Sequence, residues 1–176
     1  MISPPAAGRS VKREEGREAI KVDGDNREAP QVTDMPTTEE SYYRWLNEHS
    51  PDIISVFKID GSVLFKNPAV ERILGYAPAE LIGGNEFDYI HPEDHFRVHA
   101  ALDDVSAHQE AGPTISYRVR HKDGSWRYLE SIGRMAIDSR GELVCVVNSR
   151  DITGRVRAEM ESDAFVRELR GEPMPE

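Results

Sequence analysis

The chain has 176 residues, with 22 Lys or Arg against 32 Asp or Glu, so its formal net charge is −10. This balance argues against a nucleic-acid partner, because contacts to the phosphate backbone need a basic surface. No apolar run reaches the roughly 18 residues of a membrane helix, and the first ten residues lack the apolar stretch of a secretory signal. The single cysteine, Cys145, cannot form an internal disulfide. We therefore expect one domain of ordinary size, in the cytoplasm and without a membrane span.

Residues 1–36 combine Gly, Pro and charges of both signs with isolated apolar residues and no aromatic residue. This composition cannot bury enough apolar surface to offset its ordering entropy, so we expect a disordered N-terminal tail. Order is expected from residue 37, because Thr37 and Glu40 have the spacing of a capping box and apolar side chains follow them. The sequence predicts an N-terminal flanking helix within residues 37–49.

Two β-rich runs follow, at 52–58 and 62–66. The pair Asp60-Gly61 between them readily takes the positive φ angles of a tight turn, which predicts a β-hairpin. Asn67 is then expected to cap a helix of about two turns.

Proline and glycine divide residues 76–90 into short helical pieces, and a longer helix is expected over 92–108. One face of that helix is apolar and should pack on a sheet; it carries Val98, Ala101, Leu102 and Val105.

Three longer strands are predicted next, at 114–121, 125–137 and 142–150, separated by Asp-Gly and Arg-Gly turns. Helical spacing of apolar residues returns over 152–170. The expected order is therefore two strands, several helices, three strands and a helix.

Four stretches in this order carry a family resemblance: SPDIISVFKIDGSVLFKNPAVERILGY, IHPEDHFRV, YRVRHKDGSWRYLESIG and VVNSRDITGRVRAE. Through them, residues 50–154 resemble the PAS domain of bacterial sensory proteins, in its S-box form with the PAC segment that follows. The turn and cap residues alone are compatible with any α+β domain, and it is the order of the four stretches that indicates this family. The resemblance implies an α+β PAS fold, with a five-stranded antiparallel sheet, short helices on one face and a small cavity between them.

The resemblance also implies a function. Domains of this family hold a cofactor or metabolite in the cavity, or use the outer face of the sheet for dimerisation, and are not themselves catalysts. The segment Asp151, Ile152 and Thr153 resembles the signature that starts the helix leading to an effector, so we expect signal relay there and a signalling helix and tail over 155–176. Asp151 or Thr153 can cap that helix.

Three kinds of bound group are candidates for this chain. Light-sensing relatives hold a flavin beside a reactive cysteine in Gly-Arg-Asn-Cys, and the similar stretch here, 83–86, ends in Glu86. This excludes a cysteinyl adduct and leaves only a flavin held without that bond, for which the sequence gives no further sign. Oxygen-sensing relatives take a haem ligand from a His seven residues after a Pro, as His99 follows Pro92, although His99 falls at the edge of the apolar face. Zinc would need the stripe His95, His99 and Asp103, but no partner ligand is identifiable elsewhere and a solvated helix face explains this stripe without a metal.

A further small ligand would meet polar side chains in the cavity. The candidates are Tyr89, His99, Tyr117, Ser131 and Asn148. Each of them could equally be a satisfied polar residue at the edge of a filled core.

The sequence contains no phosphate-binding loop, nucleophile elbow or kinase signature, so we do not expect an enzyme. The prediction is a stand-alone sensory or adaptor domain in signal transduction, which binds a small molecule, a second copy of itself or a partner signalling protein. The alternatives are a detached or truncated sensor module of a histidine kinase or diguanylate cyclase, a haem-binding gas or redox sensor through His99, and a structural dimerisation module without a ligand.

Overall fold

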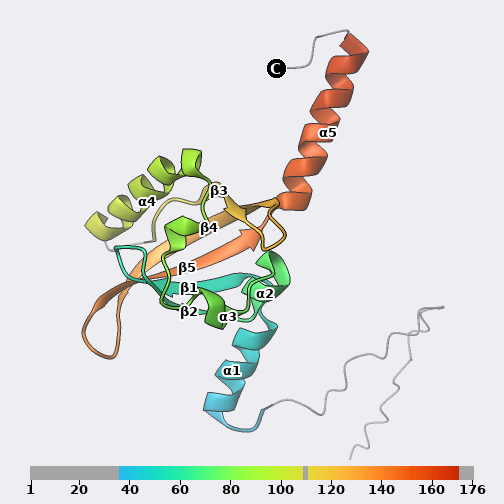
Figure 1. Cartoon of the computed structure of the whole chain (residues 1–176). Helices are drawn as coiled ribbons and strands as arrows, with labels where there is room; N and C mark the ends of the chain where they lie inside the picture. Colours follow the sequence, from blue (N-terminus) through green and yellow to red (C-terminus); the bar gives the residue numbers. More distant parts are fainter. Residues whose placement is uncertain (1–35, 109–110, 171–176) are drawn as a thin grey trace, which may run out of the picture. The chain divides into compact units, whose positions relative to one another are not determined.

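The computed structural model describes residues 36–108 and 111–170 (Figure 1). The predicted disordered tail lies outside the described residues except for Pro36, and so do the last six residues of the predicted C-terminal tail. The elements, in chain order, are α1 (Glu39–His49), β1 (Ile53–Phe57), β2 (Val63–Lys66), α2 (Ala69–Leu74), α3 (Pro78–Leu81), η2 (Glu86–Asp88), η3 (Pro92–Asp94), α4 (His95–His108), β3 (Ile115–Arg120), β4 (Trp126–Ile137), β5 (Leu143–Asp151) and α5 (Thr153–Arg170).

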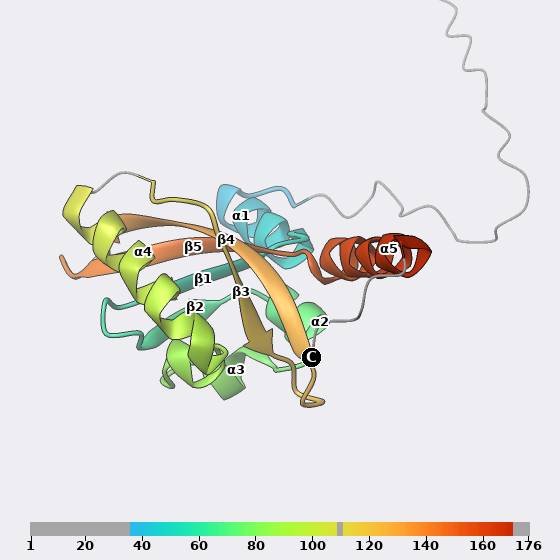
Figure 2. The same cartoon turned by 90° about the horizontal axis from the view of Figure 1, so that it is seen from above.

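The five strands form one antiparallel sheet in the order β2-β1-β5-β4-β3. Strand β5 lies at the centre of the sheet, between β1 and β4. Its Asn148 is opposite Ile54 of β1, and its Ser149 is opposite Ser131 of β4. Figures 1 and 2 show α2, α3 and α4 over one face of this sheet. The predicted α+β architecture is therefore confirmed.

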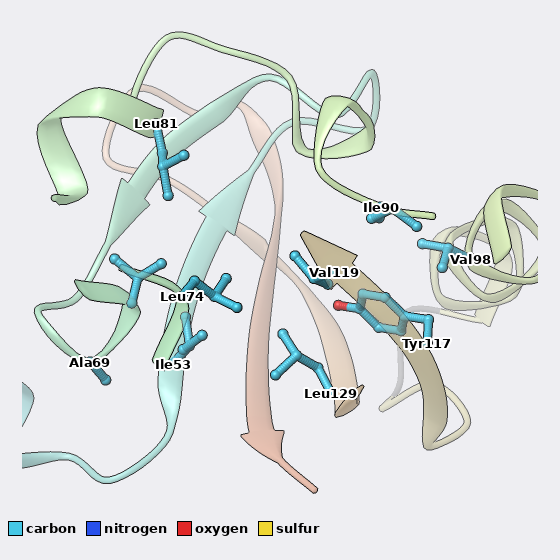
Figure 3. Close-up of a cluster of buried hydrophobic side chains, with 10 residues drawn as sticks. Ile53, Ala69, Leu74, Leu81, Ile90, Val98, Tyr117, Val119 and Leu129 are labelled. Carbon is cyan, nitrogen blue, oxygen red and sulfur yellow. The ribbon is translucent and has the colours of Figure 1, made fainter. Parts of the chain in front are cut away.

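The core lies between these helices and the sheet, in two neighbouring clusters. Figure 3 shows the first cluster, in which side chains from the sheet meet those of α2, α3 and the start of α4. The second cluster lies under α4, where Leu102 and Val105 pack against Phe57, Met135 and Cys145. The prediction that one face of the long helix packs on the sheet is confirmed, because Val98, Leu102 and Val105 are all buried.

Two expected helix caps were wrong. The capping box of α1 uses Thr38 and Ser41 instead of Thr37 and Glu40. Asn67 does not cap α2, which begins after Pro68. The Asn67 side chain is fully buried and serves the backbone of other segments: its Oδ1 accepts from Ile54 N, and its Nδ2 donates to the carbonyl oxygens of Asp52 and Asn47.

The buried Asp94 carboxylate fixes the start of α4 to strand β3. Its Oδ2 accepts from the backbone N and the side-chain Nε of Arg118, each at 2.9 Å, and its Oδ1 accepts from Arg97 at 2.8 Å. Burial alone would raise the pKa of Asp94, but the hydrogen bonds and charge of Arg118 outweigh it and lower that pKa. The helix that covers the cavity described below is thus held by an ion pair.

Candidate ligand cavity and signalling surfaces

A partly enclosed cavity of about 40 Å³ lies between α4 and the sheet. That volume admits a few water-sized groups. Its wall is mostly apolar; the residues that line it are Phe57, Val98, Ala101, Leu102, Val105, Pro113, Ile115, Tyr117, Ser131, Gly133, Cys145 and Val147. An apolar wall with a few polar groups is typical of small-molecule sites.

The polar part of the wall belongs to a row of hydroxyl groups on three adjacent strands. Ser131 on β4 lies 3.0 Å from the Tyr117 hydroxyl on β3 and 2.7 Å from Ser149 Oγ on β5. All three residues are buried. Burial raises the pKa of Tyr117 to about 12, so its hydroxyl stays protonated at neutral pH and can donate as well as accept.

A buried ion pair joins Lys66, the last residue of the edge strand β2, to Glu86 at the start of η2. Lys66 Nζ is 2.8 Å from Glu86 Oε2 and donates to Ser55 Oγ at 3.1 Å. Sequence reasoning noted Glu86 only because it replaces the cysteine of light-sensing relatives, and it missed Lys66 altogether. The local sequence offered only a lysine at the end of an apolar strand; its position opposite the inward-facing Ser55 comes from the antiparallel register of the folded sheet.

Cys145 lines the cavity as a neutral thiol. Burial raises its pKa to about 11, far above neutral pH. The thiolate is the nucleophilic form of cysteine, so a covalent adduct with this side chain is disfavoured.

The five cavity candidates from the sequence separate into two groups. Tyr117 and Ser131 line the cavity together, and they hydrogen-bond to each other. The side chain of Asn148 lies instead along a groove on the opposite face of the sheet, because neighbouring residues of a strand point to opposite faces. Tyr89 packs edge-on against Tyr76, outside the cavity wall.

His99 also lies outside the cavity. Its ring is exposed and stacks on Phe87, with ring centroids 4.0 Å apart. This position gives no support to a haem ligand facing the interior. His95 bonds the carbonyl oxygen of Ile90 through Nε2 at 3.1 Å, and within residues 36–108 and 111–170 no three His, Cys, Asp or Glu side chains gather as metal ligands.

The first turn of α5 is tied to strand β4. Asp151 Oδ1 accepts from the backbone N of Thr153 at 2.8 Å, and Thr153 Oγ1 accepts from the backbone N of Tyr128 at 2.9 Å. Arg155 donates to Glu130 at 2.8 Å. Thr153 is buried, whereas Met160 and Phe165 further along α5 are exposed.

The outer face of the sheet carries an open apolar groove of about 760 Å³. Its floor includes Ile54, Ile132 and Val146. A second groove joins it at Ser50 and Ile54 and is walled by the apolar side of α1, including Trp45 and Leu46. Although α1 carries several large apolar side chains, none of its residues is buried.

The family model described as "PAS fold" matches residues 63–150, half of the chain, and the chain therefore belongs to the PAS family. PAS domains are generally sensory, non-catalytic modules, and they commonly mediate protein–protein interactions. Over the part of the chain that the structure describes, no helix is both long and apolar enough to cross a membrane.

Among curated proteins, "Basic helix-loop-helix ARNT-like protein 2" of Gallus gallus is 34% identical over 80 residues, which cover 46% of this chain and 13% of that protein. Among solved structures, the Drosophila melanogaster Cycle W398A PAS-B domain with bound glycerol is 26% identical, with a TM-score of 0.52, over 56% of this chain and 98% of that one. A sensory box histidine kinase/response regulator from Burkholderia thailandensis is 27% identical, with a TM-score of 0.55, over 73% of this chain and 97% of that one.

Proposed function

We propose that the chain is a sensory or adaptor domain in which occupancy of the interior cavity changes the state of the flanking helices. In this proposal residues 50–154 form the receptor unit, α1 precedes it and the signalling helix within 155–176 follows it. The segment Asp151 to Thr153 is the relay, and the chain performs no catalysis.

The observation that carries this proposal is that strand β4 serves both sites. Ser131 lines the cavity, while Glu130 and the backbone N of Tyr128, on the same strand, bond the first turn of α5. A displacement of β4 by a ligand would therefore reach α5 directly. The glycerol described with the Cycle PAS-B domain supports a ligand-binding role.

We expect an occupied cavity to slow hydrogen exchange at the junction. Ala101→Leu places extra carbon atoms into the cavity space and mimics an occupant. Tighter packing under α4 should slow exchange of the Ile152 and Val156 amides by about threefold, because local opening becomes rarer. Exchange followed by mass spectrometry or NMR on the full chain measures this effect.

Ala100→Leu is the matched control, because Ala100 is the exposed neighbour on the same helix and does not line the cavity. It should leave exchange at the junction unchanged. Equal exchange in both variants and the unmodified chain would contradict the relay.

A second candidate function is protein interaction through the outer face of the sheet. We propose a second copy of the chain as the occupant, because the apolar side of α1 and the adjoining groove are both exposed and could cover each other across a two-fold axis. The same surface would serve a partner signalling protein. The likeness to the sensory box histidine kinase/response regulator keeps open the alternative that the chain is the sensor module of a larger kinase or cyclase.

We expect Ile132→Arg to convert the dimer to a monomer, because Ile132 lines the groove and the buried charge would lose its hydration without a counter-charge. Sedimentation velocity measures this change. Ile137→Arg is the control, because Ile137 is exposed on the same strand but lies outside the groove. A chain that is monomeric at every concentration, or a dimer that survives Ile132→Arg, would remove this surface from the proposal.

A further inference from the structure

We infer that the interior cavity selects a small neutral molecule that carries a hydroxyl group, of about the size of a three-carbon alcohol. This inference rests on the proposed sensory function and adds to it the chemical class of the ligand. It follows from the size, the charge and the hydrogen-bonding groups of the cavity wall. A volume of about 40 Å³ has room for only a few heavy atoms.

The wall favours a neutral occupant. No Asp, Glu, Lys, Arg or His is among the residues that line the cavity. The buried ammonium group of Lys66 is already bound to Glu86 and Ser55. A carboxylate or ammonium ligand would lose its hydration without gaining a partner of opposite charge, and that cost is large.

The hydroxyl row favours an occupant that can donate a hydrogen bond. Each hydroxyl group has one proton and two acceptor positions. The two contacts between Tyr117, Ser131 and Ser149 use two of their three protons and two of their six acceptor positions, so the row can still both donate to and accept from a ligand hydroxyl. A ligand hydroxyl in the cavity can donate to one of these positions at Tyr117 or Ser131.

The rest of the wall favours an alkyl body. Val98, Leu102 and Val105 of α4 line the cavity opposite the sheet, where an alkyl group would be shielded from water. The thiol of Cys145, held in its protonated form, does not attach the ligand covalently. The matching molecule therefore has a hydroxyl group at one end and carbon atoms at the other.

Three probes test this class on the full chain by NMR chemical-shift titration: 1-propanol, propionate and xenon. Propionate has the carbon number of 1-propanol but carries a charge, and xenon fills space without hydrogen bonds. We expect 1-propanol to shift the amide signals around Ser131 and Leu102, and propionate to leave them in place. Tyr117→Phe removes one hydroxyl and keeps the ring; it should weaken 1-propanol binding about fivefold, the factor of one neutral hydrogen bond, and leave xenon binding unchanged.

Ser131→Ala is the second variant and should act in the same direction, which protects the test against misfolding of either protein. Propionate binding as tightly as 1-propanol would overturn the neutral class. Unchanged 1-propanol affinity in both folded variants would overturn the role of the hydroxyl row while leaving the cavity as a ligand site. If no probe, including xenon, shifts the cavity signals, the ligand-sensing function itself is contradicted.

Discussion

Glu86→Leu is expected to lower the free energy of unfolding by about 3 kcal/mol or more, because it leaves the Lys66 ammonium buried without its counter-charge. The side chains of Lys66 and Glu86 are only 4% and 14% exposed, so water cannot replace the lost partner. The double variant Lys66→Met/Glu86→Leu should recover most of this loss, to within about 1 kcal/mol of the unmodified chain, since a buried pair roughly repays its own desolvation. Urea denaturation of the three proteins measures both effects.

The matched control is the exposed pair of Lys58 and Glu142, whose side chains are 2.8 Å apart but 40% and 50% exposed. Glu142→Leu should change stability by less than about 1 kcal/mol, because surface pairs contribute little. A double variant no more stable than Glu86→Leu alone would show that the buried pair stabilises the fold by more than its burial costs, which is the opposite of our interpretation.

Asn67→Ala should also lower the free energy of unfolding strongly, by about 3 kcal/mol. The substitution removes three hydrogen bonds from a side chain that is fully buried, and it leaves the backbone N of Ile54 without its side-chain acceptor. Because one of those bonds reaches Asn47 at the end of α1, the variant should also loosen that helix. Denaturation gives the first effect, and amide exchange within α1 gives the second.

Asn148→Ala is the control for this loss. Asn148 is exposed on the outer face of the sheet, so its truncation should cost less than about 0.5 kcal/mol. Equal stability of the Asn67 and Asn148 variants would mean that the buried amide is dispensable and that other contacts hold β1 against α2.

The strands were predictable because alternating apolar residues and tight Asp-Gly turns are local signals. Which of the neighbours Asn148 and Ser149 faces the cavity could not be predicted, because a shift of one residue in strand register reverses the face on which each side chain lies. Ser149, on the inner face, completes the hydroxyl row, and Asn148 faces outward. By contrast, Ser131 was identified from the sequence and lies at the cavity wall.

The ion pair could not be derived from local patterns. Glu86 comes from a short turn 20 residues after Lys66, and the two meet only when the chain folds back over β2. A lysine at a strand end is ordinarily exposed, so its burial depends on this distant partner. Distant partners also explain the wrong cap at Asn67, whose side chain bonds the backbone of Ile54, Asp52 and Asn47 instead of the start of α2.

The pairing of Ile53 with Ser149 has a consequence for how this domain can be combined with others. It places the beginning of β1 beside the end of β5, and the ion pair between Asp52 and Arg150 joins these two ends, with Nη2 and Oδ2 3.0 Å apart. The polypeptide therefore enters the sheet at β1 and leaves it at β5 at adjacent points. A domain whose chain ends are adjacent can be inserted into a surface turn of a host protein without stretching that turn. If the inserted domain unfolded, its two ends would separate and the two sides of the host turn would move apart.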